Sequence, residues 1–563
     1  MKTLIKLFII TIVLQSGMVL AQNDSVVVIA PYQPSISDAV KINFSPKISS
    51  QKVERQPMEY SIISRKIATE VELEQIKLAK FRERKSHEKL QRNQIRLGAG
   101  NYSTTYMEFF ANSIQNEDFA LGVHAKHLAS NGKIDGYGNP ANSENLIELS
   151  GTKFWKEYLL KGDIHFDREV VHFYGFEPAL FPNNDTAKND ELYRQRFVLL
   201  EAKASGKSMH NSKNKLNHSF NTGFYHLYDK FESAENHFNF DANLNHNVNW
   251  LKVLKNQNFG VDLGFKYYNS GDSTTAYNAM FFDAAPYLAT SFTHYDVKLG
   301  FKTSVASDQI QGDTATNTKV YFYPVVDLKI HIVPEHLSLF GGLSGKQYRN
   351  GYRSLTEENP YINPVTPVSN TNYKFEAYGG ISASIGQSFD MNLGVYNSTV
   401  DDMIFFEKDI AADPKNMFTY VKDNGQILRI HADMALELKE AFKMKISANY
   451  YDYKLESLEH AWYKPQYDGQ IDLSYKFLNQ FEAHAGMYMC GKRWAREYTE
   501  PSEDLKAIEL DGIIDANIGL DYDHNENLGA FIRVNNILAS RYYNWVDYPS
   551  YKLNAIAGVK YSF

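Results

Sequence analysis

Two carboxylate pairs come closest to a catalytic pattern in this sequence. Asp401 and Asp402 are adjacent, and Asp511 and Asp515 are four residues apart. Paired carboxylates can act as general acid and base, or can bind calcium. Adjacent acids in loops more often face solvent, and acids at i and i+4 on a strand lie too far apart to share a proton. We therefore expect these pairs to have no catalytic role.

Histidine and cysteine give no stronger signal. None of the 17 His residues shows an HExxH or comparable ligand spacing, which favours structural histidines or histidines in a wet interior. The sequence contains no GxSxG elbow, P-loop or GxGxxG in a strand-to-helix context. The single Cys490 cannot form an internal disulfide, a CxxC pair or a multi-Cys zinc site, and is most simply a small filler residue. We expect a non-enzymatic protein without a metal or cofactor.

Composition excludes two further classes. The 563 residues carry 59 Lys+Arg and 66 Asp+Glu, a formal charge of −7. The chain therefore lacks the excess of basic residues that a nucleic-acid-binding protein needs. Apolar residues make up 43% of the chain, yet the mean hydropathy is −0.42, which does not fit a bundle of membrane-spanning helices. Aromatic residues reach 14%, with 38 Tyr.

The first 21 residues are typical of a secretory signal. Lys2 and Lys6 precede the apolar stretch 7–14, and Val19-Leu20-Ala21 forms a small-residue cleavage site. Beyond Gln22 no stretch reaches the roughly 18 continuous apolar residues of a membrane-spanning helix. An exported chain of this kind is periplasmic, secreted or a β-barrel.

Alternation of apolar and polar residues predicts many strands. It is clear over 551–563 and continues for fifteen residues over 508–522, whereas soluble strands usually have about 5–6. The same pattern occurs at 373–385, 389–395, 442–450 and 481–489.

A soluble sandwich would alternate in the same way, but three features favour a membrane barrel. The strands are long enough for a tilted crossing, aromatic residues gather at strand ends such as 321–323 and 542–545, and short connections alternate with long ones. We predict an all-β fold: a transmembrane antiparallel β-barrel of about 20–22 strands over residues 94–563, in the outer membrane.

Because successive side chains of a strand point to opposite faces, the sequence also predicts which charged residues face the barrel interior. Their mixed signs argue against strong ion selectivity, and the simplest role for them is to hydrate the lumen or to pair with each other. The predicted lumenal charges are Lys374, Glu376, Lys443, Lys445, Glu482, Glu509, Asp511, Asp515 and Arg533.

Residues 22–93 form a separate periplasmic segment. Asp24-Ser25-Val26-Val27-Val28-Ile29-Ala30 is a short β-branched stretch, and residues 77–92 contain seven basic and two acidic residues. The basic stretch fits a solvated helix face, or a contact with anionic lipid or a protein partner.

The C-terminal region resembles the TonB-dependent-receptor-like β-barrels of Gram-negative outer membranes, especially those of the Bacteroidetes type. The residues that carry this resemblance are 534–538 (VNNIL), Tyr542-Tyr543, the closing 558–563 (GVKYSF) with Tyr561 and Phe563, and Ala21-Gln22. In such receptors a segment like Asp24 to Ala30 would be a TonB box, which pairs strand to strand with the energising protein.

The resemblance also implies a plug of well over a hundred residues between box and barrel, but 31–93 supplies only 63. A barrel of about 22 strands needs an occluded lumen, so we expect occlusion by 22–93, by the long loops with 351–372 foremost, or by another protein. The sequence favours a channel, or a membrane subunit of a larger assembly, without a full plug. The alternatives are a TonB-dependent importer with a reduced plug and a barrel hydrolase. Expected partners are outer-membrane lipid and a periplasmic or outer-membrane protein, not nucleic acid.

Overall fold

The structure is a computed structural model. It describes residues 93–113, 118–181, 189–209, 215–248, 250, 256–272, 275–310, 316–386, 388–412, 415–439, 441–499 and 504–563. All of them belong to the unit Ser86–Phe563. The predicted signal, the stretch 24–30 and the basic stretch 77–92 lie outside the described residues.

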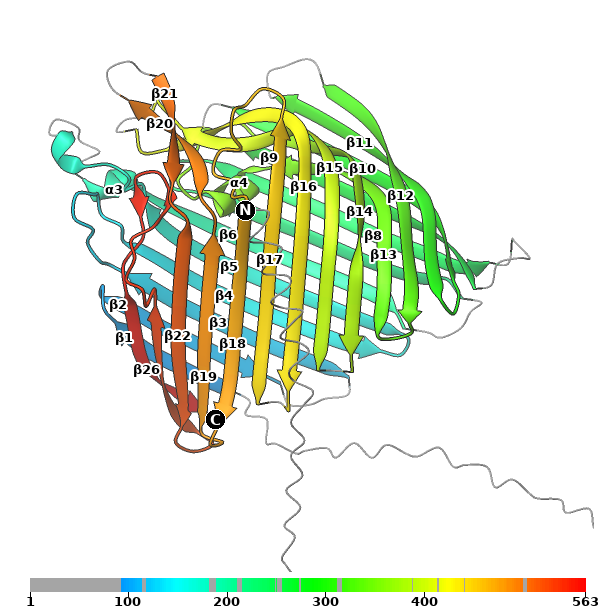
Figure 1. Ribbon diagram of the computed structural model, residues 1–563, viewed down its shortest axis with the longest axis horizontal. Helices are drawn as coiled ribbons and strands as arrows, with labels where there is room; N and C mark the ends of the chain where they lie inside the picture. The colour runs from blue at the N-terminus through cyan, green and yellow to red at the C-terminus, as the bar shows by residue number, and fades with distance from the viewer. Residues whose placement is uncertain are drawn as a thin grey trace, which may run out of the picture. The chain divides into compact units, whose positions relative to one another are not determined.

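Most of the described chain forms one antiparallel sheet of 22 strands (Figure 1). These strands are β1 (Asn93–Gly100), β2 (Thr104–Asn112), β3 (Phe119–Ser130), β4 (Asn142–Trp155), β5 (Tyr158–His172), β6 (Arg194–Ser208), β7 (Asn217–Tyr228), β8 (Ala234–Val248), β9 (Gln257–Gly271), β10 (Ala276–Ser291), β11 (Tyr295–Ile310), β12 (Asn317–Val333), β13 (Leu337–Asn350), β14 (Ser369–Ile385), β15 (Phe389–Lys408), β16 (Phe418–Leu438), β17 (Phe442–Leu455), β18 (Tyr467–Phe477), β19 (Phe481–Cys490), β22 (Ile513–Asp523), β23 (Leu528–Asn535) and β26 (Asn554–Ser562).

The remaining elements are short and lie in the connections. They are the 3₁₀ turn η1 (Pro178–Leu180), the helices α3 (Asp190–Tyr193) and α4 (Tyr352–Glu358), and two hairpins made by β20 (Arg493–Thr499) with β21 (Asp504–Leu510) and by β24 (Tyr543–Trp545) with β25 (Tyr548–Pro549). No described helix has the length and apolar character needed to span a membrane.

The sheet closes on itself between its first and last strands. β1 pairs with β26 over Gln94–Gly100, and the backbone of Phe563 exchanges hydrogen bonds of 3.0 and 3.1 Å with Asn93. Closure leaves no open sheet edge, which is what the interior of a bilayer requires. The predicted all-β barrel is therefore confirmed, and its strand number is at the upper end of the predicted 20–22.

The longest connections lie at one rim, and most of the tight turns lie at the other (Figure 1). Tight turns such as 334–336 and 478–480 lie at the rim that also holds the C-terminus. Leu478 and Asn479 both have positive φ (53° and 55°), a conformation that tight hairpin connections often need. The longer loops, including 131–141, 351–368 and 491–512, lie at the other rim. Short turns mark the periplasmic side of such barrels, so the long loops are extracellular.

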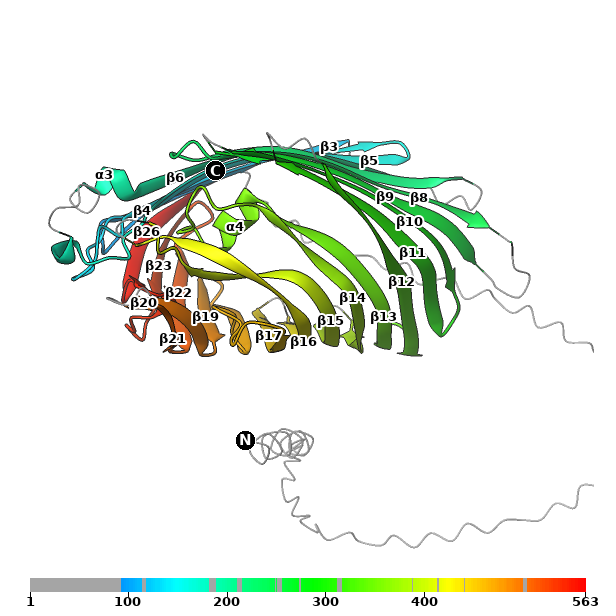
Figure 2. The same ribbon diagram turned by 90° about the horizontal axis from the view of Figure 1, so that it is seen from above.

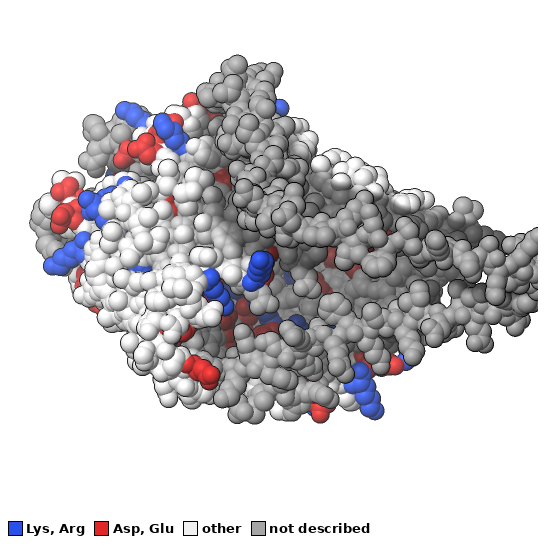
Figure 3. All heavy atoms as spheres, turned by 60° about the horizontal axis from the view of Figure 1, so that its bottom comes forward, with Lys and Arg blue, Asp and Glu red and all other residues white. Residues whose placement is uncertain are grey.

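Apolar side chains cover the outside of the barrel. Phe322 is 72% exposed, and Leu121, Ile164 and Met280 are likewise exposed on the outer face. Such a surface is stable only against lipid. Figure 3 shows charged side chains at the rim and in the hollow of the barrel, beside an outer surface that is largely free of charge. The chain is accordingly a protein of the cell outer membrane.

One predicted strand is wrong. The alternation over 508–522 continues through two separate strands, because β21 pairs with β20 in its own hairpin whereas β22 pairs with β19 in the barrel wall. Glu509 lies on the hairpin and Asp511 in the connection that follows it. Parity alone cannot detect this change of partner strand.

Candidate functional site

The extracellular connection between β13 and β14 forms a strap across the inside of the barrel mouth. We use "strap" for residues 351–368, which begin with α4. Figures 1 and 2 both place α4 within the ring of strands. The strap contacts the inner wall at β6 to β8 and then packs on the β15–β16 connection before it joins β14.

Glu235 on β8 holds the first turn of the strap. Its side chain is fully buried, and its carboxylate accepts hydrogen bonds from the backbone nitrogens of Tyr352 (2.8 Å) and Arg353 (3.3 Å). Two hydroxyls, those of Tyr225 (2.6 Å) and Ser270 (2.7 Å), donate to the same carboxylate. The first N–H groups of a helix lack partners within it, so Glu235 acts as the cap that α4 does not supply itself.

Gly351 makes this capping geometrically feasible. It is the N-cap residue of α4 and has no side chain to offer. A β-carbon at this position would lie 2.5 Å from Oε2 of Glu235, far inside van der Waals contact. The glycine is therefore needed for the close approach of the carboxylate rather than for a left-handed backbone, since its φ is −80°.

Asp229 binds the side chain of the same strap residue. Its Oδ2 accepts hydrogen bonds from Oη of Tyr352 (2.6 Å) and Nε2 of Gln195 (2.7 Å), and its Oδ1 accepts from the backbone nitrogens of Phe231 and Ser233 (both 2.8 Å). Burial raises the pKa of Asp229 above its usual range, although these four donors favour the charged form. Burial also raises the pKa of Tyr352 well above its ordinary value, so its hydroxyl remains a donor.

Arg353 adds an ion-pair contact to the wall. Nη1 lies 3.0 Å from Oε1 of Glu201 on β6, and Nε lies 2.7 Å from Oε1 of Glu357 one turn further along α4. The guanidinium also lies over the ring of Tyr225, 4.7 Å from its centroid. Burial lowers the pKa of Arg353, but the two carboxylates raise it more, so it stays above its ordinary value and the charge persists.

The second half of the strap is tied to β16. The backbone nitrogen of Asn363 donates to the carbonyl of Phe418 (2.7 Å), and the nitrogen of Phe418 donates to the carbonyl of Tyr361 (3.1 Å). The hydroxyl of Ser233, in the connection between β7 and β8, donates to the carbonyl of Pro364 (3.0 Å). The second half of the strap therefore also contacts this part of the barrel. The strap is therefore anchored at wall positions eight strands apart.

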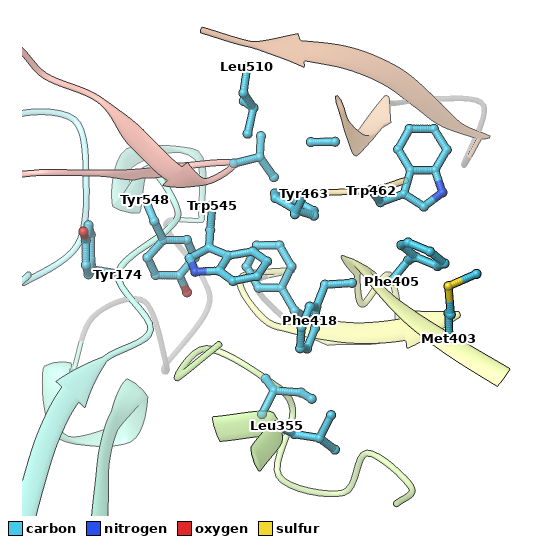
Figure 4. Packing of buried hydrophobic residues seen from close by; sticks show 14 of the residues in the cluster. Tyr174, Leu355, Met403, Phe405, Phe418, Trp462, Tyr463, Leu510, Trp545 and Tyr548 are labelled. Atoms are coloured by element: carbon cyan, nitrogen blue, oxygen red, sulfur yellow. The ribbon is translucent and has the colours of Figure 1, made fainter. Parts of the chain in front are cut away.

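The strap contributes Leu355 and Ile362 to an apolar cluster at the extracellular mouth of the barrel. Leu355 of α4 packs with buried residues of β15, the first residue of β16 and the connections that follow β3, β5, β17, β19 and β23 (Figure 4). Phe418 is fully buried at its centre, with ring centroids 5.4 Å from Trp545, 5.8 Å from Tyr463 and 5.9 Å from Tyr548. We call this set the mouth cluster. Its full membership is Ile134, Tyr174, Leu355, Ile362, Val400, Met403, Phe405, Phe406, Phe418, Trp462, Tyr463, Ala495, Leu510, Trp545, Val546 and Tyr548.

Two tyrosines of the mouth cluster act as neutral hydrogen-bond donors. Burial raises the pKa of Tyr174 and of Tyr548 above the ordinary value. The hydroxyl of Tyr174 donates to the carbonyl of Pro549 (2.9 Å), and that of Tyr548 donates to the carbonyl of Asn416. Buried loop carbonyls are costly without a donor, so these bonds hold loops from three different connections together.

Four of the sequence-predicted lumenal charges take part in local pairs. Lys374 lies 2.7 Å from Asp401, and Lys443 lies 3.2 Å from Glu437. Glu376 accepts a hydrogen bond from Ser398 (2.7 Å), and Glu482 accepts one from Ser474 (2.7 Å). These contacts are spread from β14 to β19 and do not form one site.

Of the five remaining predicted charges, three lie on strands of the barrel and two lie outside the barrel wall. Asp515 accepts a hydrogen bond from Tyr542 (2.6 Å), and Arg533 pairs with Asp521, which also lies 2.9 Å from Nε2 of His484. Lys445 lines a separate cavity of about 450 Å³ beside β14 to β18. Glu509, on the β20–β21 hairpin, pairs with Lys492 (2.6 Å) and, like Asp511, is not part of the barrel wall.

The two carboxylate pairs considered in the sequence lie at a strand bulge and at the start of a strand. Asp402 has a positive φ (54°) at the bulge in β15, where its backbone nitrogen donates to Asn424 (3.0 Å). Asp511 and Asp515 lie on either side of the start of β22. No group of three or more His, Cys, Asp or Glu side chains among the described residues could hold a metal ion. Cys490 is buried at the end of β19.

The C-terminal aromatic residues lie on the lipid side of the seam. Tyr561 and Phe563 are about half exposed on the outer surface, with stacked rings 5.8 Å apart. Sequence reasoning missed Asp229, Glu235, Tyr352 and Arg353. The alternation over 234–248 was a usable signal that Glu235 points inward, but nothing in the sequence connects it with a loop more than a hundred residues later.

Comparison with known proteins shows which solved structures share the fold of this barrel. No protein-family model and no curated protein matches this sequence. Solved structures do match. The ferripyoverdine receptor of the Pseudomonas aeruginosa outer membrane, bound to ferripyoverdine, has a TM-score of 0.60 at 13% identity, with 84% of this chain and 72% of that chain covered. The fold is that of an outer-membrane receptor barrel.

Two further receptor-type barrels match over the same share of this chain, 84%. The ferric-catecholate import receptor Fiu from Escherichia coli K12 has a TM-score of 0.60 at 8% identity, with 82% of that chain covered. The FrpB iron transporter from Neisseria meningitidis has a TM-score of 0.61 at 10% identity, with 81% of that chain covered. At such identities the likeness shows the fold alone. The Bacteroidetes character and the shortened plug stay predictions.

Proposed function

We propose that this protein is an outer-membrane channel without a full plug, whose extracellular mouth is closed by its own strap and mouth cluster. It acts alone or as the membrane subunit of a larger assembly, and its role involves no catalysis. The observation that carries the proposal is the anchoring of the strap by two buried carboxylates, Asp229 and Glu235. A permanently open pore would not need such a closure.

The inner wall supports passage of polar solutes once the mouth opens. Inward-facing charges of both signs pair locally, as in Lys374 with Asp401 and Lys443 with Glu437. Such a lining is hydrated but carries no ring of one sign, so we expect weak ion selectivity.

Planar-bilayer recordings on the purified full chain test this proposal. The native protein should show rare or small conductance steps. A variant in which residues 352–358 are replaced by a Gly-Ser linker of equal length should show larger and more frequent steps. Heat-modifiable migration on gels would verify that the variant still forms the barrel. Equal conductance of two correctly folded proteins would contradict closure by the strap.

A TonB-dependent importer with a reduced plug is the second candidate, supported by the stretch Asp24 to Ala30 and by the receptor-type fold. Deletion of residues 24–30 separates the two functions. An importer would lose uptake, whereas a self-closed channel would keep its conductance and its effect on growth. Uptake that persists after the deletion would remove the importer.

The assembly form of the proposal predicts a stable partner. Purification in mild detergent, followed by mass spectrometry, should then recover a second outer-membrane or periplasmic protein in fixed stoichiometry. Recovery of the barrel alone, with native conductance, would favour a channel that acts by itself.

A further inference from the structure

A cavity of about 170 Å³ lies between the strap and the inner wall. Its walls come from β7 to β10 and from β13, and Gly351, Arg353, Ser354 and Glu357 of the strap close one side. This volume is below the roughly 300–1,000 Å³ of clefts for drug-sized ligands. The cavity therefore suits a compact solute of about one ring.

The charges around this cavity cancel. Lys266, Arg349 and Arg353 face Glu235, Asp283 and Glu357, so the formal sum is zero. Several of these groups already have partners. Arg349 lies 2.9 Å from Asp308, and Lys302 lies 3.4 Å from Asp283. An ionic ligand would meet no excess of the opposite charge, and its desolvation would not be compensated.

Donors and acceptors with unused hydrogen-bonding capacity nevertheless line the cavity. Among the described residues, the Nζ of Lys266 and the Oη of Tyr268 have no hydrogen-bond or ion-pair partner. Nε of Arg349 and Oδ1 of Asp283 are buried and also lack partners within the described part of the chain. Buried polar groups are nearly always satisfied, and exceptions gather at functional sites. A hydroxyl group, which both donates and accepts, matches such a mixed set.

Aromatic rings give the same cavity a rigid apolar wall. The ring of Tyr268 stacks on that of His237, with centroids 4.0 Å apart, and meets the edge of Phe281 at 6.0 Å. Phe281 is 5% exposed. The hydroxyl of Tyr268 is therefore held in place, beside apolar surface that the C–H face of a ring can cover.

We propose that this cavity binds an uncharged, polyhydroxylated solute of one-ring size. Lys266 and Tyr268 bind its hydroxyl groups, Phe281 and Tyr268 contact its apolar face, and the strap closes over it. The inference goes beyond the proposed channel, because binding at this wall does not require conduction.

Saturation-transfer NMR on the full chain tests the inference. The protein would be purified in lauryldimethylamine oxide, since a sugar-headgroup detergent would compete. The probes are myo-inositol and D-glucose, with glycine and inorganic phosphate as charged competitors. We expect transfer to at least one polyol, and neither competitor should displace it.

Matched variants assign the signal to the cavity. Tyr268→Phe and Lys266→Met should each reduce polyol transfer at least threefold. Tyr451→Phe and Lys445→Met are the controls, because both residues lie on the inner face of β17, away from this cavity. The controls should keep native transfer, and heat-modifiable migration would verify folding of all four variants.

Three results would overturn the inference: no transfer to either polyol, equal transfer in cavity and control variants, or displacement by glycine or phosphate. Conductance recorded on the same samples keeps the two proposals separate. A barrel that binds polyol and never conducts would remove the channel function and leave this site standing.

Discussion

The carboxylate of Glu235 lies where a side chain on Gly351 would otherwise be. Oε2 of Glu235 accepts the backbone N–H of Tyr352 at 2.8 Å, and a β-carbon on Gly351 would come within 2.5 Å of the same oxygen. A residue of the barrel wall thus caps a helix that enters from a distant loop. The position of the strap depends on this close fit.

Gly351→Ala should release the strap. Its β-carbon cannot coexist with the Glu235 carboxylate, so α4 loses its cap and moves away from the wall. Trypsin should then cleave after Arg353, which mass spectrometry would detect, and bilayer conductance should rise. Gly486→Ala is the control, because the nearest atom to its β-carbon, Oδ1 of Asp472, would lie at an ordinary 3.5 Å. Cleavage at the same rate in both variants would refute the capping role.

Tyr352→Phe and Asp229→Asn should be strongly coupled. Tyr352→Phe removes the donor of the 2.6 Å hydrogen bond between Oη of Tyr352 and the carboxylate. Asp229→Asn replaces one of the two acceptor oxygens by an amide group that donates, so fewer of the four donors to this side chain keep an acceptor. We expect each single change to weaken strap closure by about 1–3 kcal/mol, and the double variant to cost less than the sum. The rate of tryptic cleavage after Arg353 would be measured in the native protein, in the two single variants and in the double variant. Converted to free energies of strap opening, the four rates give the coupling between the two side chains. Additive effects would show that the two side chains do not interact.

Strap closure should strengthen as the pH falls. Burial raises the pKa of Asp229 in the closed state, whereas in an open strap the carboxyl is solvated and titrates near the ordinary value of about 3.9. The closed state therefore binds a proton more tightly, and closure weakens as the pH rises through the raised pKa. Bilayer recordings at pH 5 should show fewer open events than at pH 7.5. Asp229→Asn should flatten this difference, and an unchanged pH profile in that variant would assign the effect to another group.

Phe418→Ala should loosen the mouth cluster without unfolding the barrel. Loss of a fully buried phenyl ring costs about 3–5 kcal/mol and leaves a cavity between Trp545, Tyr463 and Tyr548. We expect faster proteolysis of the extracellular loops but unchanged heat-modifiable migration. Phe322→Ala is the comparison, since that ring is 72% exposed on the lipid side and contributes no loop packing. Equal loop proteolysis in the two variants would contradict a structural role for the cluster.

Regular alternation made the barrel predictable, and its limits are equally specific. The predicted strands 373–385, 389–395, 442–450 and 481–489 all lie within strands of the sheet. The stretch 508–522 shows the same alternation, yet it changes partner at Asp511. Periodicity reports that a residue is in a strand, whereas hydrogen-bond pairing decides which sheet that strand belongs to.

The inward charges illustrate a second limit. Parity indicates that Glu235 points into the barrel, as it does for Glu482. Only the tertiary structure distinguishes them: Glu235 is completely buried beneath the strap, while Glu482 accepts one hydrogen bond from the neighbouring Ser474. Whether water or a loop covers an inward residue depends on contacts between segments far apart in sequence.

The sequence by itself determined the class of this protein: an all-β chain with an apolar outer face, a polar inner face and alternating short and long connections. These properties follow from local chemistry, because side chains of a strand alternate and bilayers select closed sheets. Only the tertiary structure decided how the mouth is closed. Asp229 and Glu235 meet Tyr352 because strand tilt and loop packing bring them together across the barrel, and no local pattern encodes that meeting.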